Sequence, residues 1–173
     1  MGGEQRMTRV ILLERLRDFT LDATKDILMP VRRQREDKEP PADRAATVYL
    51  TRLVKSSEAQ KATPYILHQV ITGKDLQSSG QDITAETVVR SIFAVYNDNE
   101  QEGGLMLLNL MERVRVALLK KVVIGQQFQL DLTAGLETLI YPDDTAPYYA
   151  GEMISVWRLP AVEREVNLYG TIE

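Results

Sequence analysis

The chain has 173 residues, a formal charge of −4 and no cysteine; 44% of its residues are hydrophobic and 27% are charged. This length fits one domain with a single core, and the apolar content predicts that most of the chain folds. The acidic balance argues against a generally basic nucleic-acid binder. The lack of cysteine excludes disulfides, thiolate metal sites and a cysteine nucleophile, and it suits a reducing compartment.

The sequence shows no pattern typical of a targeting or membrane segment. Its apolar runs fall short of the roughly 20 residues that a membrane helix needs. The first residues, MGGEQRM, lack the apolar stretch of a signal peptide, and Arg6 stands where a myristoylation pattern requires Ser or Thr. We therefore expect a soluble protein that is made and used in the cytoplasm and has no membrane partner.

The first expected element is a helix over residues 8–28, because Pro30 disfavours helix in the residue before it. Its expected apolar stripe consists of Leu12, Leu16, Phe19, Ala23 and Ile27. A flexible loop over residues 29–47 follows, with its most charged part at residues 32–44. That part has mixed charges, no large apolar residue and the pair Pro40-Pro41. Such loops are commonly functional or disordered, so this one is either a solvated spacer or a contact surface.

The middle of the chain predicts strands over residues 48–54, 65–72 and 86–96, since these are rich in β-branched and aromatic residues. The connection over residues 73–82 is rich in turn formers. In the third strand Val89, Phe93 and Val95 share one face, while Val88, Ile92 and Ala94 share the other. The second half of that strand is therefore expected to be buried on both sides.

The strongest periodic signal is a helix over residues 105–121. Its expected buried face consists of Leu107, Leu110, Met111, Val114 and Leu118, at the spacing that a 3.6-residue period requires. Strands are predicted over residues 128–132, 136–141 and 151–159, with a three-residue hairpin loop at 133–135 and a weakly patterned tail at 161–173. This order predicts a single α+β domain with a mainly antiparallel sheet packed against both helices.

Candidate sites for chemistry are few. His68 is the only histidine, and no orienting carboxylate is near it in sequence, so a structural role is favoured over general base chemistry. The segment from Asn97 to Glu102 is rich in oxygen ligands, but an EF-hand loop requires glycine at the sixth position, where Glu102 stands. Its acidic residues are better explained as favourable charges ahead of a helix N-terminus, and they would repel a phosphate from Gly103-Gly104.

The pair Asp143-Asp144 has two interpretations. Two carboxylates could act in glycoside hydrolysis, but adjacent aspartates before Thr145-Ala146-Pro147 are more typical of a turn. The aromatic residues Tyr148, Tyr149 and Trp157 are equally compatible with a core and with an interface. The sequence therefore predicts no catalytic residue, cofactor site or metal site.

A longer pattern resembles a known family. The segment VYNDNEQEGGLMLLNLMERVRVALL is followed by FQLDL and LETLIYPDDTAPYYAGEMISVWRLPAVERE. Their shared features are an acidic end to a strand, a glycine, a Leu-Leu-Asn-Leu helix core, an acidic turn with Pro147-Tyr148-Tyr149, and Trp157 ahead of Pro160. In this order the segments resemble the tail terminator, or tail completion, proteins of long-tailed bacteriophages and prophages. The likeness covers roughly residues 48–165.

This resemblance implies a virion structural protein without catalysis or cofactor. Proteins of the family form a ring, usually of six subunits, at the head-proximal end of the tail, after assembly in the bacterial cytoplasm. The ring stops polymerisation of the major tail tube protein and receives the head-completion or connector protein, with DNA passing through its lumen. The candidate interface residues are Arg32, Arg33, Arg35, Asp143, Asp144, Tyr148 and Tyr149.

Two alternatives remain open from the sequence. One is a head-completion or neck connector protein, which would bind the portal complex in place of the tail tube. The other is a small hydrolase with an unfamiliar site, for which His68 and Asp143-Asp144 would be the first residues to test.

Overall fold

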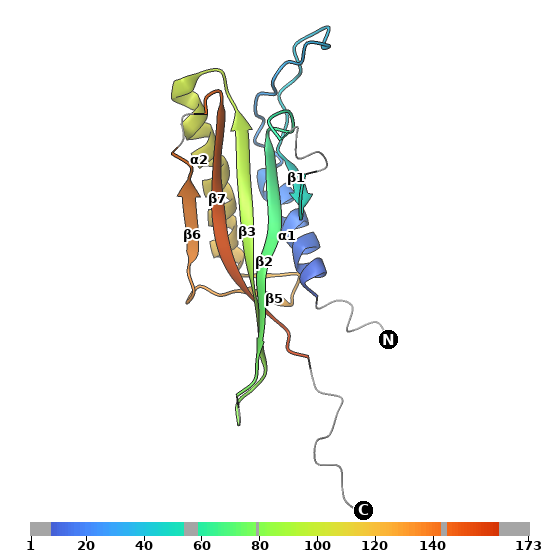
Figure 1. The fold of residues 1–173 in the computed structure, drawn as a ribbon, viewed down its shortest axis with the longest axis vertical. Helices are drawn as coiled ribbons and strands as arrows, with labels where there is room; N and C mark the ends of the chain where they lie inside the picture. The colour runs from blue at the N-terminus through green and yellow to red at the C-terminus, as the bar shows by residue number, and fades with distance from the viewer. Residues whose placement is uncertain (1–7, 54–58, 79, 143–144, 163–173) are drawn as a thin grey trace, which may run out of the picture.

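The computed structural model describes residues 8–53, 59–78, 80–142 and 145–162. Figure 1 shows the fold, an α+β domain in which two helices pack on a curled, mixed sheet. In chain order the elements are α1 (Arg9–Thr24), β1 (Thr47–Leu50), β2 (Tyr65–Leu76), β3 (Thr84–Tyr96), α2 (Glu100–Lys121), β4 (Val123–Ile124), β5 (Phe128–Leu130), β6 (Leu136–Ile140) and β7 (Tyr148–Leu159). The predicted α+β class is confirmed.

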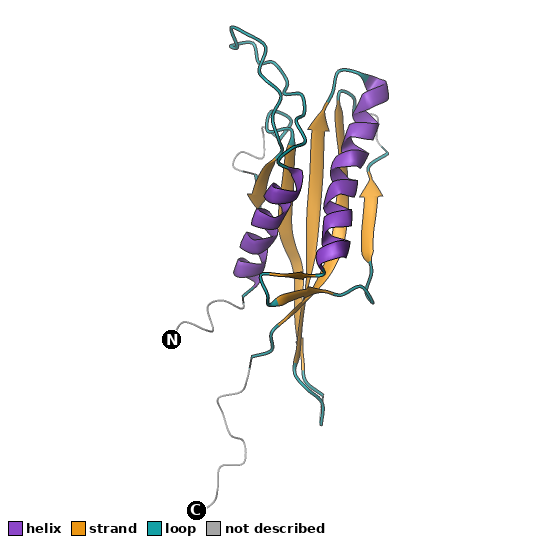
Figure 2. Ribbon diagram, turned by 180° about the vertical axis from the view of Figure 1, so that it is seen from behind, coloured by secondary structure: helices purple, strands orange, loops and turns teal. Residues whose placement is uncertain are grey.

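The sheet has the order β1-β2-β3-β7-β5-β4, and β6 also pairs with β7. Among the described strands, β1 and β2 run parallel and every other pair is antiparallel. Both helices lie on the same face of the sheet, as Figure 2 shows. α1 packs against β1 and β2, and α2 packs against β3 and β7. The main core therefore lies between the helical layer and this one face.

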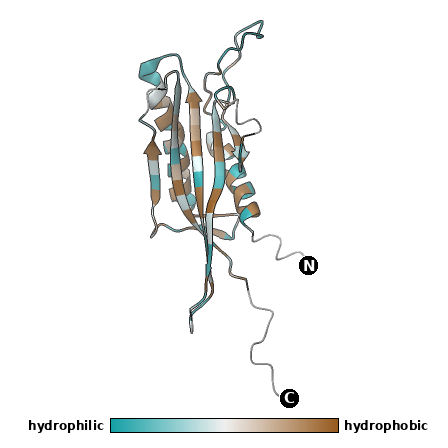
Figure 3. Ribbon diagram, viewed as in Figure 1, coloured by the Kyte–Doolittle hydropathy of each residue, from teal (hydrophilic) through white to brown (hydrophobic). Residues whose placement is uncertain are grey.

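The α2 helix buries the residues that its periodicity predicts, from Leu107 to Leu118, and Trp157 of β7 lies wholly in the same core. In β3, Val89, Phe93 and Val95 point into this core, whereas Ala94 belongs to a smaller cluster with Leu53, Tyr65 and Leu67 on the opposite face. The prediction that the second half of β3 is buried on both sides is confirmed for these residues. Figure 3 shows apolar and polar residues mixed along the strands of the sheet.

The predicted extent and stripe of the first helix were partly wrong. α1 ends at Thr24, and the chain then turns so that Met29 can pair with Arg44. Its buried stripe is Leu12, Leu13, Leu16, Thr20 and Thr24. Each threonine hydroxyl donates to the carbonyl oxygen four residues earlier, at 2.7 and 2.8 Å, so a polar side chain can be buried without an unpaired donor. A hydropathy pattern does not show that a buried hydroxyl group has a hydrogen-bond partner.

The second helix begins earlier than predicted, at Glu100 in place of residue 105. Asn99 is its N-cap, and the Asn99 carboxamide oxygen accepts hydrogen bonds from the backbone N–H groups of Gln101 and Glu102. Glu102 therefore lies within the first turn, where the helix dipole favours its charge, and not ahead of the helix. Gly103 and Gly104 fall inside the helix for the same reason.

The predicted hairpin between residues 128–132 and 136–141 is wrong. β5 and β6 do not pair with each other; both pair with β7, in the same direction along it. Leu130 lies opposite Trp157 and Leu136 opposite Ser155, so residues 131–135 form an excursion from one interrupted strand. Asp131 stabilises the excursion, because its carboxylate accepts from the N–H groups of Thr133 and Ala134 and from the Arg158 guanidinium.

The short strand β4, which pairs with β5, was not predicted, and the other differences are in the lengths of strands. β1 stops at Leu50, whereas β2, β3 and β7 are longer than predicted. β2 continues through Gly73 to Leu76 and forms with β3 an arm that extends past the helices (Figure 1). The arm is tied to α1 by an ion pair of 3.3 Å between Arg9 and Asp75.

Candidate interface at one end of the sheet

The end of α2 that follows β3 packs against the start of β7 through a glycine. A Cβ at Gly103 would lie 2.0 Å from Cε2 of Tyr149, so the Tyr149 ring occupies the space of a side chain. The Tyr149 hydroxyl donates to the Glu100 carbonyl at 3.4 Å. Gly103 therefore allows an aromatic ring to lie on the first turn of the helix, which is a packing role and leaves no room there for an anion.

The turn between β3 and α2 is joined to the turn before β7. The Asn97 N–H donates to the Pro147 carbonyl at 2.9 Å, and the Asn97 side-chain oxygen accepts from the Asn99 N–H at 2.9 Å. Thr145 accepts at its carbonyl from the Tyr148 N–H and donates its hydroxyl to the Tyr148 carbonyl. Residues 97–103 and 145–149, almost 50 positions apart, are thus parts of one end of the molecule.

Tyr148 lies at the outer part of this end and connects it to the long loop. The Arg32 guanidinium donates to the Tyr148 hydroxyl and lies 5.6 Å from the Tyr148 ring centroid. The Tyr96 ring packs against Tyr148 with 5.5 Å between centroids. Tyr96 donates to the Asp98 carboxylate at 2.5 Å, and this hydrogen bond, more than burial, raises the pKa of Tyr96 to about 12. Arg32, Tyr96 and Tyr148, with Tyr149 and Asp98 beside them, form what we call the aromatic end.

The loop of residues 31–43 is attached at its base by Arg44. The Arg44 guanidinium donates to the carbonyl oxygens of Ala45, Ala62, Thr63 and Pro64 and to the Thr47 hydroxyl, at 2.9 to 3.1 Å. Burial lowers the pKa of Arg44. This anchor consists of hydrogen bonds, mostly to backbone carbonyls, and the absence of large apolar residues in the loop neither predicts nor excludes them. Whether the rest of the loop is mobile stays a prediction.

The three loop arginines (Arg32, Arg33 and Arg35) all line one hollow of the loop, together with Gln34, Glu36 and Lys61. They differ in their contacts. Arg32 also reaches Tyr148, as described above. The Arg33 guanidinium makes long contacts, of 3.5 Å, to the carbonyl oxygens of Asp37 and Lys38. Of the other predicted interface residues, Tyr149 and Tyr148 belong to the aromatic end, and Asp143 and Asp144 lie outside the described residues.

His68 is buried in the core between α1 and β3. Its Nε2 lies 2.9 Å from the Thr20 hydroxyl and its Nδ1 lies 2.7 Å from the Ser91 hydroxyl. The Thr20 hydroxyl proton is used for the Leu16 carbonyl, so Thr20 accepts from His68 Nε2–H and Ser91 donates to Nδ1. Burial lowers the pKa of His68 to about 3. The side chain is a neutral structural group without access to a substrate.

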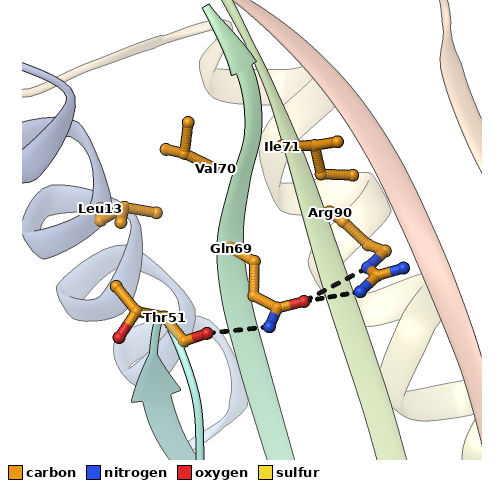
Figure 4. A pocket seen from close by; sticks show the side chains of 6 residues that line it. All are labelled: Leu13, Thr51, Gln69, Val70, Ile71 and Arg90. Atoms are coloured by element: carbon orange, nitrogen blue, oxygen red, sulfur yellow. Dashed lines mark hydrogen bonds between the residues drawn. The ribbon is translucent and has the colours of Figure 1, made fainter.

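A shallow pocket lies where β1 ends and β2 becomes the edge of the sheet (Figure 4). The Gln69 side chain crosses it, donating to the Thr51 carbonyl at 2.8 Å and accepting from the Arg90 guanidinium at 2.9 Å. Leu13, Val70 and Ile71 supply the apolar part of the lining. The lining residues include no carboxylate, histidine or cysteine.

Among the described residues, no group of three or more His, Cys, Asp or Glu side chains could hold a metal ion. No helix of the described part is long and apolar enough to cross a membrane. A scan against protein-family models found no match to this chain, and a search of curated proteins found none either.

Proposed function

We propose that the chain is a tail terminator, or tail completion, protein of a long-tailed bacteriophage or prophage. It assembles into a ring, expected to have six subunits, on the head-proximal end of the tail tube. There it stops addition of the major tail tube protein and offers its other surface to the head-completion protein. In this proposal the chain needs no catalysis and no cofactor.

The proposal rests on one observation: the fold brings together in space the separate parts of the sequence pattern that resembles the family. The acidic end of β3 and the glycine in α2 belong to one segment, residues 97–103, which is far in sequence from the Pro147-Tyr148-Tyr149 turn, yet the two segments contact each other at the aromatic end. A second glycine of the pattern also has a packing role, since a Cβ at Gly151 would lie 2.8 Å from the Leu139 carbonyl oxygen and 2.9 Å from Met111 Sδ. Residues of the pattern that are distant in sequence are thus in contact in the folded chain, where its glycines make room for neighbouring side chains and backbone.

The aromatic end suits a protein partner. Tyrosine and arginine are enriched at the centres of protein interfaces, because they combine large contact area with hydrogen bonding. Tyr148 and Arg32 are only partly covered by their own chain, and they hold each other in position. A surface that is ordered before binding loses less conformational entropy when a partner docks.

Tube polymerisation tests the proposal. A major tail tube protein from the same genome is allowed to polymerise alone or with the purified chain, and tube lengths and tips are measured by negative-stain electron microscopy. We expect shorter tubes that carry extra density at one tip. Tyr148→Ala should lose this effect, whereas Asp75→Ala, on the arm at the opposite end of β2, should keep it. Tubes of unchanged length without tip density would refute the proposal.

A further inference from the structure

The two lateral flanks of the molecule each carry exposed apolar residues on a helix. On α1, Val10 and Leu21 are exposed, and on α2, Leu108 and Leu119 are exposed. Members of each pair are eleven positions apart, which is close to three helical turns, so each pair lies on one line along its helix. Large apolar residues aligned along a helix and left in water are typical of a surface that binds another surface.

These lines lie on the outer sides of the helical layer. Inside one chain α2 faces α1 through Arg113, which contacts the Ala23 carbonyl oxygen of α1 at 3.4 Å and, just beyond the end of α1, the Asp26 carboxylate at 2.7 Å. At about 100° per residue, Leu108 and Leu119 lie more than about 110° around α2 from Arg113. By the same geometry, Val10 and Leu21 lie roughly 140–160° around α1 from Ala23. One line therefore faces outward beyond α1 and the other beyond α2, on opposite flanks (Figure 2).

The strands at these flanks have matching directions. β1 lies on the α1 flank and β6 on the α2 flank, and within the described residues each pairs with a strand on one side only. β1 is parallel to β2, and the steps from β2 to β3, β7 and β6 are each antiparallel. β1 and β6 therefore run in opposite directions. If two copies stand side by side with the same orientation, β6 of one copy is antiparallel to β1 of the next.

The helices match in level as well. α1 and α2 are antiparallel, because Asp26 contacts Arg113 whereas Arg15 lies beside Gly125 beyond the other end of α2. If a neighbouring copy stands beside the first without a shift along the helix axes, Leu21 of one copy therefore lies at the same height as Leu119 of the other.

Charges at this level of α1 are mixed. Glu14 and Asp18 stand beside Arg15 and Arg17, and Arg17 pairs with Asp18 at 3.2 Å. A second copy placed beside the first thus brings leucine side chains to the same level, and charge does not favour or oppose the contact.

We propose that the α1 and β1 flank of one copy binds the α2 and β6 flank of a second copy. Two different surfaces of the same chain then meet head to tail, which is the type of contact that closes a ring when the rotation fits. The occupant of each flank is a second copy of this chain, because Leu21 of one flank is level with Leu119 of the other and because the edge strands β1 and β6 have the directions that an antiparallel pair requires. This inference rests on the ring assembly of the proposed function and names the surfaces that form the ring.

Cysteine cross-linking tests the contact directly, since the natural chain has no cysteine. Leu21→Cys and Leu119→Cys variants are mixed under mild oxidation and analysed on non-reducing gels. We expect mixed disulfide dimers of the two variants to dominate over dimers of either variant alone. Leu105→Cys, near the other end of α2, is the matched control and should not couple with Leu21→Cys. Absence of mixed dimers, or equal coupling of the control, would overturn the inference.

Charge substitution tests whether the contact is head to tail. We expect Leu21→Glu and Leu119→Glu each to abolish self-association, while an equimolar mixture gives a dimer of twice the 19.6 kDa chain mass, because each variant retains one intact flank. The readouts are light scattering coupled to size exclusion and native mass spectrometry, with thermal unfolding to verify folding. Leu76→Glu, an exposed apolar site on the arm that extends past the helices, is the control and should assemble normally.

These assays separate the inference from the proposed function, because they contain no tube protein. A wild-type chain that stays monomeric at high concentration, or a mixture of the two variants that stays monomeric, would overturn the flank contact. The tube assay would still decide whether the chain terminates tails. Tail termination without self-association, and self-association without tail termination, are therefore distinguishable results.

Discussion

Lowering the pH from 8 to 5 is expected to destabilise this protein mainly through its single histidine. His68 is wholly buried and neutral, with a pKa lowered from 6.5 to about 3 by burial. The folded-state pKa lies below the unfolded-state value, so between these values the unfolded chain binds more protons than the folded one. Stability is therefore complete above the unfolded pKa and falls as the pH decreases below 6.5.

The size of the effect follows from the two pKa values. Each pH unit between them costs about 1.4 kcal/mol, so the loss between pH 8 and pH 5 is roughly 2 kcal/mol. Three carboxyl groups with lowered pKa values, Asp26, Glu112 and Asp131, have ordinary values of 3.8 to 4.5. They titrate in the unfolded chain mostly below pH 5 and add little in this window.

Urea unfolding at pH 8, 7, 6 and 5 measures this loss for the wild-type chain and for His68→Gln. The variant is expected to be less stable at pH 8, because Gln cannot reproduce both hydrogen bonds, but its stability should be nearly constant across the series. A wild-type stability that changes by less than about 0.5 kcal/mol over this range would refute the neutral, buried imidazole. It would also be refuted if the free energy of unfolding of His68→Gln changed with pH as much as that of the wild type.

Three further predictions concern packing and the loop. Gly103→Ala should lower the free energy of unfolding in urea by about 1–3 kcal/mol, because the new Cβ clashes with Tyr149. Gly104→Ala, whose Cβ meets open space, should be neutral or stabilising. Equal effects of the two substitutions would contradict the packing role of Gly103. Leu110→Ala should lower the free energy of unfolding by about 2–4 kcal/mol, and the same change at the exposed Leu105 should lower it by less than about 0.5 kcal/mol. A loss below about 1 kcal/mol for Leu110→Ala would mean that another face of α2 packs on the sheet. Replacing the three loop arginines by serine should leave the melting temperature almost unchanged and weaken tube binding, more strongly at low salt; normal binding at every ionic strength would make the loop a spacer.

The sequence predicted the elements whose signal is periodic hydropathy. The buried face of α2 and the two-sided burial at the end of β3 follow from spacing alone, because burial of apolar area decides both. The prediction failed for α1, where Thr20 and Thr24 are buried in place of Phe19 and Ala23. Their hydroxyl groups are satisfied by backbone carbonyls and by His68, and a hydropathy pattern contains no information about hydrogen-bond partners.

The aromatic end could be predicted only in part. Tyr148, Tyr149 and Arg32 were among the expected interface residues, but their contacts with one another depend on the long-range pairing of β3 with β7. Tyr96 was seen only as a strand residue, although it packs on Tyr148. Gly103 had a visible signal, a glycine inside a helix-forming sequence, yet only the fold shows that Tyr149 fills the space beside it.

The excursion at residues 131–135 makes this part of the chain a natural place for an inserted label. The strand leaves β7 after Leu130 and resumes at Leu136, while on the β7 side only Val156 is passed over. Extra residues placed at Ala134, which is exposed, would lengthen a segment that already stands away from the ladder, so the pairings on either side need not shift. A short epitope or fluorophore tag there would mark the chain without occupying the aromatic end.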